Sequence, residues 1–165
     1  MKSVVVYESL WGNTAAVARA IAEGLGEGAT ALSTSEADSA ALEGADLIVA
    51  GSPLLGFNLP TDEMRAGIAA NPGPRAPKPD VSAPSMRAWL SALPVGTARF
   101  ATFETRIWWS PGSVPKHVAA SLSAKGFHQV AAPEKFIVSG KYGPLKDGEL
   151  DRARAWGATL ARAAS

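Results

Sequence analysis

A short polar loop near the N-terminus has the residue types that bind a phosphate group. Residues 8–14 read ESLWGNT and lie between an apolar run and a helix-like pattern. Free backbone N–H groups at a helix start, together with the helix dipole, favour an anion. The side chains of Ser9, Asn13 and Thr14 add donors, and Gly12 lets the backbone approach closely. The loop predicts a phosphate-monoester site, although an ordinary capped strand-to-helix turn explains the same residues.

Composition excludes several other chemistries. The chain has 165 residues and no cysteine, which excludes disulfides, thiolate metal sites, thiol nucleophiles and cysteine-ligated iron–sulfur clusters. His117 and His128 have neither metal-ligand spacing nor a triad context. The loop 8–14 contains no Lys or Arg and is therefore not a P-loop. We predict no catalytic side chain and no metal site.

Charge is unevenly distributed, although the formal net charge is only +1. Residues 1–70 hold nine acidic and three basic side chains, and residues 71–165 hold six acidic and thirteen basic ones. This pattern indicates either solvated helix faces or a dipole that orients a docking partner. The basic half lacks the clustered basic and aromatic stripe typical of nucleic-acid binding.

Strand-like and helix-like segments alternate along the chain. The sequence predicts strands at 4–7, 29–32, 46–51, 98–103 and 134–138. It predicts helices at 13–25, 61–70, 85–93, 113–125 and 147–163, and a shorter one that follows a capping box at 33–36 and ends near 42. The fold class is therefore α/β: a doubly wound, five-stranded parallel sheet of order 2-1-3-4-5, with helices on both faces.

This topology selects the loops in which a ligand would lie. In such sheets ligands bind beyond the carboxyl ends of the strands, where the strand order reverses. That point falls between the first and third strands, so loops 8–14 and 51–61 are the informative ones, with 104–113 beside them. Residues 71–84 contain five prolines and are interpreted as an exposed insertion within a single domain, 1–165.

Two segments carry a resemblance to a known family. Residues 4–14, VVVYESLWGNT, resemble the flavodoxin signature Thr/Ser-x-Thr-Gly-x-Thr at the end of the first strand. Residues 46–53, DLIVAGSP, are similar to that family's third strand and the start of its flavin loop. The resemblance implies a flavodoxin-like fold and flavin mononucleotide (FMN) as cofactor. Trp11 stands where flavodoxins usually have Thr, so one hydroxyl donor is lost.

The resemblance also implies positions for the cofactor. The residues expected around the phosphate are Ser9, Leu10, Trp11, Gly12, Asn13 and Thr14. Those expected along the isoalloxazine are Pro53, Leu54, Leu55, Gly56 and Phe57, with Phe57 stacked on one face. Those expected at the pyrimidine end are Glu104, Thr105, Arg106, Trp108 and Trp109, with one of the two tryptophans on the other face. The alternatives are that the second loop packs on the core, and that the tryptophans pack internally or meet a partner protein.

Arg106 is the main departure from the family pattern. Flavodoxins surround the flavin with negative charge, which disfavours the reduced, anionic flavin and lowers the reduction potential. A guanidinium beside the ring would have the opposite effect and give a less reducing potential. Alternatively, Arg106 pairs with Glu8 or Glu104 and has little electrical effect.

Three functions remain open at this level. The leading prediction is an FMN-binding redox protein that transfers electrons between a reductase and an acceptor, with redox proteins or a small acceptor such as a quinone as partners. The alternatives are an FMN-dependent NAD(P)H:quinone-type oxidoreductase and a flavodoxin-fold binding protein that has lost FMN. Met1-Lys2-Ser3 runs directly into a strand and no apolar run approaches membrane-spanning length, so we expect a cytoplasmic protein.

Overall fold

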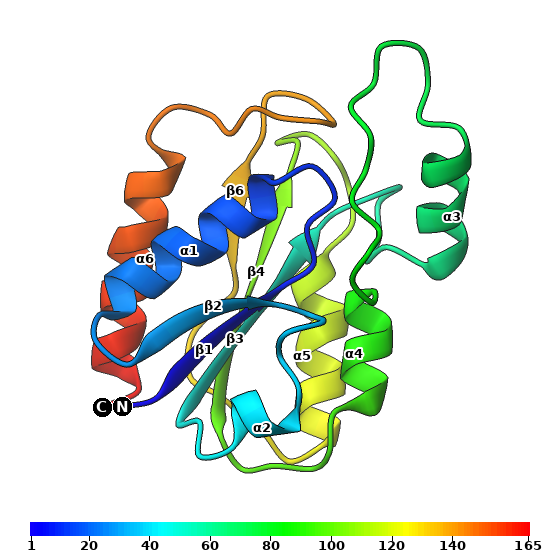
Figure 1. Ribbon diagram of the computed structural model, residues 1–165. Helices are drawn as coiled ribbons and strands as arrows, with labels where there is room; N and C mark the ends of the chain where they lie inside the picture. Colours follow the sequence, from blue (N-terminus) through cyan, green and yellow to red (C-terminus); the bar gives the residue numbers. More distant parts are fainter.

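The computed structural model describes residues 1–165 as alternating strands and helices (Figure 1). The strands are β1 (Ser3–Tyr7), β2 (Ala29–Ser33), β3 (Leu47–Pro53), β4 (Arg99–Arg106), β5 (His128–Gln129) and β6 (Glu134–Ile137). The helices are α1 (Asn13–Leu25), α2 (Ser39–Leu42), α3 (Asp62–Ala70), α4 (Met86–Ala92), α5 (Val114–Ala124) and α6 (Glu149–Ala163). Strands and helices alternate except at α3–α4 and β5–β6, and this alternation produces a parallel sheet covered on both faces.

The sheet has the predicted order. All its strand pairs are parallel, and the strands follow the order β2-β1-β3-β4-β5, with β6 also paired to β4. Two short strands fill the fifth position: β5 pairs with Arg99 and Phe100, and β6 pairs with Phe103–Arg106. The strand predicted at 134–138 corresponds to β6, and the two-residue strand β5 that precedes it is not predicted.

Both faces of the sheet are buried because neighbouring side chains on each strand point to opposite sides. Val4 and Val6 belong to the apolar core that contains α4 and α5 residues, whereas Val5 belongs to the core that contains α1 and α6 residues. Figure 1 shows α1 and α6 together on one side of the sheet and α4 and α5 on the other. The helix α3 and the chain that follows it extend away from the sheet beside the carboxyl ends of the strands.

Helices α1 and α6 pack closely because each has a glycine where they meet. A Cβ atom at Gly157 would overlap the carbonyl oxygen of Ile21, and a Cβ atom at Gly24 would overlap that of Arg154. The neighbouring atoms belong to the backbone, so no side chain can turn aside to make room. The two glycines therefore set the separation of the helices.

The predicted start of the second helix is wrong. The Glu36 carboxylate accepts the backbone N–H of Ser33 at 2.8 Å, but the Ser33 hydroxyl donates to that same carboxylate instead of accepting a helical N–H. Residues 33–36 consequently form a turn. The helix begins only at Ser39, where the carboxylate of Asp38 caps the first turn.

Two other boundaries differ from the prediction. The strand β4 continues to Arg106 instead of ending at Phe103, so Glu104 and Thr105 lie on the strand and not in the following loop. Gly148, with φ of 84°, precedes α6 in the place predicted for a cap by Asp147. None of the helices combines the length and apolarity needed to cross a lipid bilayer.

Candidate functional site

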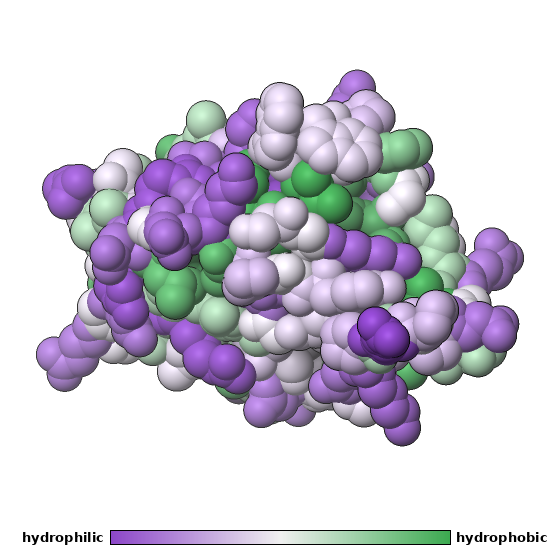
Figure 2. Space-filling view, turned by 90° about the horizontal axis from the view of Figure 1, so that it is seen from above, coloured by the Kyte–Doolittle hydropathy of each residue, from purple (hydrophilic) through white to green (hydrophobic).

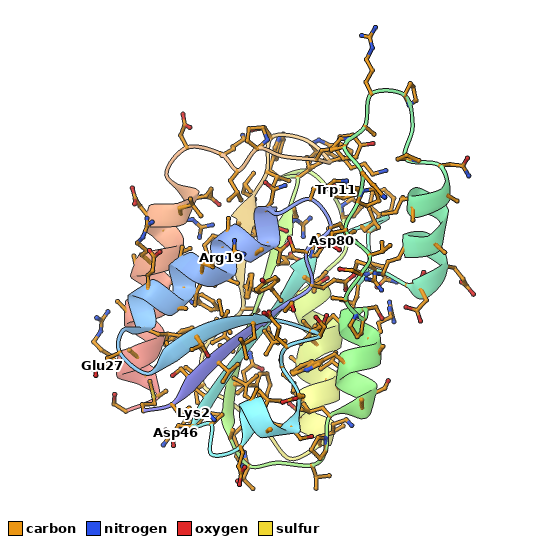
Figure 3. All side chains as sticks on the ribbon, viewed as in Figure 1. Lys2, Trp11, Arg19, Glu27, Asp46 and Asp80 are labelled. Atoms are coloured by element: carbon orange, nitrogen blue, oxygen red, sulfur yellow. The ribbon has the colours of Figure 1, made fainter.

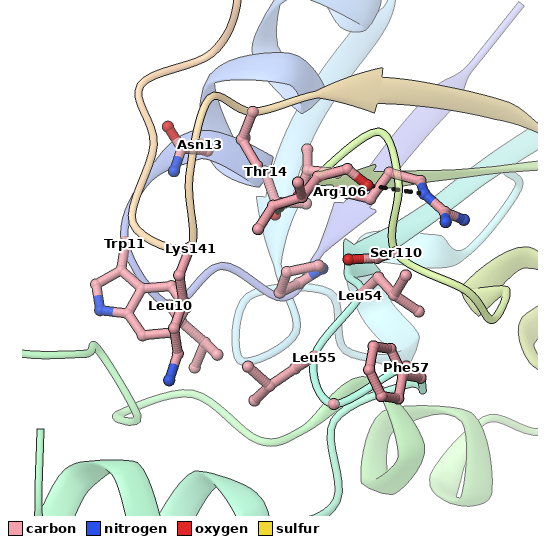
Figure 4. A pocket seen from close by; sticks show the side chains of 15 residues that line it. Leu10, Trp11, Asn13, Thr14, Leu54, Leu55, Phe57, Arg106, Ser110 and Lys141 are labelled. Carbon is pink, nitrogen blue, oxygen red and sulfur yellow. Dashed lines mark hydrogen bonds between the residues drawn. The ribbon is translucent and has the colours of Figure 1, made fainter.

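A cavity of about 250 Å³ opens at the carboxyl ends of the central strands, where the strand order reverses. Figure 2 looks down on this end of the molecule and shows hydrophobic groups recessed near the middle, with hydrophilic groups around the margin. Loops after β1, β3, β4 and β6 supply its walls (Figure 4). The lining residues are Leu10, Trp11, Asn13, Thr14, Pro53, Leu54, Leu55, Gly56, Phe57, Thr105, Arg106, Ile107, Ser110, Val138 and Lys141.

The loop after β1 offers backbone donors that have no acceptor. The Ser9 hydroxyl oxygen accepts the N–H groups of Gly12 at 3.1 Å and Ala15 at 3.2 Å, which curls the loop over the start of α1. Gly12 has φ of 92°, in the left-handed region that favours glycine. The other N–H groups of residues 10–14 make no hydrogen bond within the chain. Because the positive end of the α1 dipole adds to these donors, the loop can bind an anion.

Two side-chain hydrogen bonds connect the loop after β1 to neighbouring segments. The buried hydroxyl oxygens of Thr14 and Thr105 lie 2.8 Å apart, which joins the start of α1 to the end of β4. The Asn13 amide donates at 3.1 Å to the carbonyl oxygen of Tyr142, in the loop after β6. These bonds hold three sides of the cavity in fixed relation.

The loop after β3 forms an apolar wall. Leu55 and Asn58 exchange two backbone hydrogen bonds, of 2.9 and 3.0 Å, which close a tight turn. Gly56 and Phe57 at its tip both have positive φ, 53° and 66°. The Phe57 ring is 57% exposed and the carbonyl oxygen of Phe57 lies against Gly112, so the second and third loops touch at this point. An apolar wall that faces solvent fits a flat aromatic ligand.

Five predicted site residues do not line the cavity. Ser9 and Gly12 form the outer side of the phosphate-binding loop and line a different, polar depression. Glu104 is buried, and its carboxylate contacts Arg106 and the start of α5 instead of lining the cavity. Trp108 and Trp109 are 68% and 60% exposed, because the extension of β4 places them in a turn closed by the hydrogen bond from Ser110 to Ile107. The stacking of one tryptophan on the flavin stays a prediction.

Arg106 lines the cavity, but its charge has a partner. Its Nη1 lies 2.9 Å from Oε1 of Glu104 and also donates to the carbonyl oxygen of Gly112 at 2.9 Å. The other oxygen of Glu104 accepts the N–H of Val114 at the start of α5. The sequence leaves open whether Arg106 is a free charge beside the flavin or pairs with Glu8 or Glu104. In the structure it pairs with Glu104.

Glu8, the residue directly after β1, has a buried carboxylate. One oxygen accepts the N–H of Met86 at 2.8 Å, and the other lies 3.1 Å from Nε of Arg65 without the alignment of a hydrogen bond. Burial raises the pKa of Glu8 above its ordinary value of 4.5, more than Met86 and Arg65 lower it. Glu8 thus links the end of β1 to α3 and α4.

The raised pKa of Glu8 predicts a pH dependence of stability. Between pH 4.5 and the folded-state pKa, the folded protein binds the Glu8 proton more tightly than the unfolded chain does. This contribution to the free energy of unfolding therefore decreases as pH rises through that interval. We expect Glu8→Gln to remove it, so that the free energy of urea unfolding of the variant, taken relative to wild type, rises with pH across that interval. Equal slopes for variant and wild type would contradict the expectation.

Four lining residues were missed by sequence reasoning. Ile107 and Ser110 belong to the turn after β4, and Val138 and Lys141 follow β6. The sequence places the 138–141 segment after a predicted strand, at the same edge of the sheet as the other loops. That signal alone could have included Lys141, although Gly140 and Gly143-Pro144 around it are also typical of an ordinary turn.

The proline-rich loop, residues 71–84, packs against the loop after β1, residues 8–14. The N–H of Asp80 donates to the carbonyl oxygen of Leu10 at 2.8 Å, and Nε1 of Trp11 donates to that of Pro77 at 3.3 Å. Figure 3 shows Trp11 and Asp80 near each other at this end of the sheet. The insertion therefore supports the outer side of the site.

The fold and site define a doubly wound α/β protein with a loop of free backbone N–H groups at its topological switch point. The family model Flavodoxin matches residues 5–93, so the chain belongs to the flavodoxin family. Comparison with curated proteins gave no match. FMN is the cofactor that membership of this family implies for the chain.

Solved structures are similar over nearly the whole chain. A flavodoxin from the domain Archaea has a TM-score of 0.69 and 20% identity, with 99% of each chain covered. The flavodoxin of Streptococcus pneumonia TIGR4 has a TM-score of 0.68 and 14% identity, with 98% of this chain and 99% of that chain covered. A WrbA-like flavodoxin from Agrobacterium tumefaciens has a TM-score of 0.60 and 22% identity, with 99% and 96% covered. At these identities the likeness shows the fold.

Proposed function

We propose that the chain is an FMN-binding electron-transfer protein that carries electrons between a reductase and an acceptor, with FMN held in the cavity described above. The observation that carries the proposal is the set of free N–H groups at residues 10–14, next to an apolar wall, in a chain of the flavodoxin family. The absence of cysteine suits work in a reducing compartment such as the cytoplasm.

The phosphate of FMN would lie on the loop after β1. The free N–H groups of Trp11, Asn13 and Thr14 would donate to its oxygens, and the α1 dipole would stabilise its charge. Ser9 would act behind the loop, because it does not line the cavity and its hydroxyl oxygen holds the N–H groups of Gly12 and Ala15. This assignment keeps the predicted role of the loop and changes the role of Ser9 from donor to support.

The ring of FMN would lie against the apolar wall. Leu54, Leu55 and Phe57 would cover one side, and Thr105 and Ile107 would approach from the end of β4. Burial of apolar surface between a flat ring and these side chains would exclude water from that face. Phe57 is itself exposed, so the edge of the FMN ring beside it would stay accessible for electron transfer.

FMN supplies the redox chemistry when bound, and the chain supplies position and potential. The lining side chains include no carboxylate, imidazole or thiol, so none is suited to exchange a proton with a substrate near neutral pH. This favours an electron carrier over a stand-alone enzyme. The same lack of carboxylates leads us to expect a less reducing potential than that of a flavodoxin with an acidic flavin site. Two well-separated reduction steps at low potential in a redox titration would contradict this.

Turnover measurements separate the carrier from the enzyme. The protein is loaded with FMN and mixed with NADH or NADPH and a quinone, with and without an added flavoprotein reductase. A carrier oxidises the nicotinamide slowly by itself and faster in proportion to the reductase. Fast NAD(P)H oxidation that needs only this protein and the quinone would instead establish a quinone-type oxidoreductase. Failure of the folded protein to take up FMN would remove both functions.

A further inference from the structure

Lys141 brings a positive charge without a partner to the cavity. It makes no ion pair or hydrogen bond within the chain, and no carboxylate lines the cavity. The other lining cation, Arg106, is paired with Glu104. Lys141 is exposed at the mouth of the cavity, so its ammonium group is free to meet an anion that binds there.

Lys141 lies beside two aromatic side chains. Its Nζ lies 6.0 Å from the ring centroid of Trp11 and 5.7 Å from that of Tyr142, within range of cation–π attraction. The two rings meet edge to face with centroids 5.0 Å apart. The carbonyl oxygen of Tyr142 accepts the Asn13 amide, and Gly143 lies so close to the Asn13 side chain that a Cβ there would overlap it. The loop after β6 is therefore attached to the phosphate-binding loop, and Figure 4 shows Lys141 beside Trp11.

We propose that the ammonium group of Lys141 contacts the phosphate of bound FMN and selects FMN over riboflavin. The inference rests on the proposed FMN site. Trp11 carries one of the free N–H groups, so an anion bound there lies next to the ring over which Nζ sits. The loop itself has no Lys or Arg, and at position 11 it has an indole instead of a hydroxyl donor. Lys141 supplies from another loop the donor and charge that residues 8–14 lack.

The other roles open to Lys141 predict different results. A lysine that only packs on Trp11 and Tyr142 would affect both flavins equally, through the shape of the wall. A lysine that contacts only a partner protein would affect neither. A contact with the phosphate affects FMN alone, because riboflavin has the same ring and ribityl chain without the phosphate.

Flavin titrations of wild type, Lys141→Gln, Lys141→Arg and Lys146→Gln test the inference, with protein fluorescence and flavin fluorescence as readouts. Lys146 is exposed in the same segment and lies outside the cavity, so its variant controls for the loss of one charge. We expect Lys141→Gln to raise the Kd for FMN about tenfold, since a hydrogen bond to a charged group is lost. Lys141→Arg retains most of the affinity, and Lys146→Gln behaves as wild type.

Further readouts sharpen the result. Riboflavin affinity, where measurable, is unchanged in Lys141→Gln, and the salt dependence of FMN binding becomes weaker because one charge contact is gone. FMN affinity equal in wild type and Lys141→Gln, or an equal loss for both flavins, would overturn the role of Lys141 while leaving the FMN site intact. A folded wild type that does not bind FMN would instead overturn the proposed function.

Discussion

Replacing Asn13 with Asp is expected to weaken FMN binding about a hundredfold, since like charges brought together at a binding site cost several kcal/mol. Asn13 is the first residue of α1 and lies among the free N–H groups of the loop. A carboxylate at this position would repel the phosphate dianion and accept the same N–H donors. The side chain keeps its size, so the shape of the cavity is preserved.

We expect the Asn13→Asp variant to fold with nearly the stability of wild type. The aspartate loses the hydrogen bond to Tyr142 but gains a favourable interaction with the positive end of α1, whose first turn has no acidic residue. These effects are of similar size, about 0.5 to 1 kcal/mol each, and oppose one another. Urea unfolding of the apo-protein should therefore change by less than about 1 kcal/mol.

Asn58→Asp is the matched control for the charge. Asn58 lies in the tight turn of the apolar wall, and its Oδ1 accepts the N–H of Leu59, which an aspartate can also do. Its charge acts on FMN and riboflavin alike, whereas Asn13→Asp discriminates against FMN. An Asn13→Asp variant that binds FMN as tightly as wild type would exclude this loop as the phosphate site.

Gly157→Ala should lower the stability of the fold, although alanine is the better helix former. The added Cβ would overlap the carbonyl oxygen of Ile21, and the two helices would have to separate. Such overpacking costs about 1 to 3 kcal/mol, occasionally more. The higher helix propensity of alanine returns about 1 kcal/mol. We expect a net loss of about 1 kcal/mol, and of about 2 kcal/mol at most, in the free energy of unfolding, measured by urea denaturation.

Gly67→Ala provides the opposite case with the same substitution. Gly67 lies within α3, has nothing within 4 Å of its Cβ position and does not have a positive φ. Only the propensity term remains, so this variant should gain up to about 1 kcal/mol. If Gly157→Ala is as stable as Gly67→Ala, the close packing of α1 on α6 is not a constraint on the fold.

Much of the fold could be predicted because it depends on local pattern. The uninterrupted apolar residues Val4–Val6 indicate a strand buried on both faces, and the structure places them in two cores. Errors arose where a single hydrogen bond decides the outcome. The carboxylate of Glu36 closes a turn instead of a helix. Strand β5 was missed because two exposed residues carry no periodic pattern.

The candidate site also has one part that the sequence reveals and another that it does not. The phosphate-binding loop is contiguous, so its donors can be recognised from residues 8–14 alone. The ring end depends on where β4 stops, and the sequence does not reveal that Glu104 and Arg106 continue the strand. This extension moves Trp108 and Trp109 away from the cavity lining. Lys141 reaches the cavity only through the topology of the sheet, far from the motif in sequence.

The most direct test of the FMN site follows the backbone amide signals of ¹⁵N-labelled apo-protein by NMR during titration with FMN and with riboflavin. If the phosphate binds at the loop after β1, FMN should cause large shifts of the Trp11, Asn13 and Thr14 amide signals. Their free N–H groups would then acquire phosphate acceptors. Riboflavin should move the signals of the apolar wall, such as Leu55, and leave these three nearly unchanged. FMN binding that does not shift these three amide signals would contradict the account.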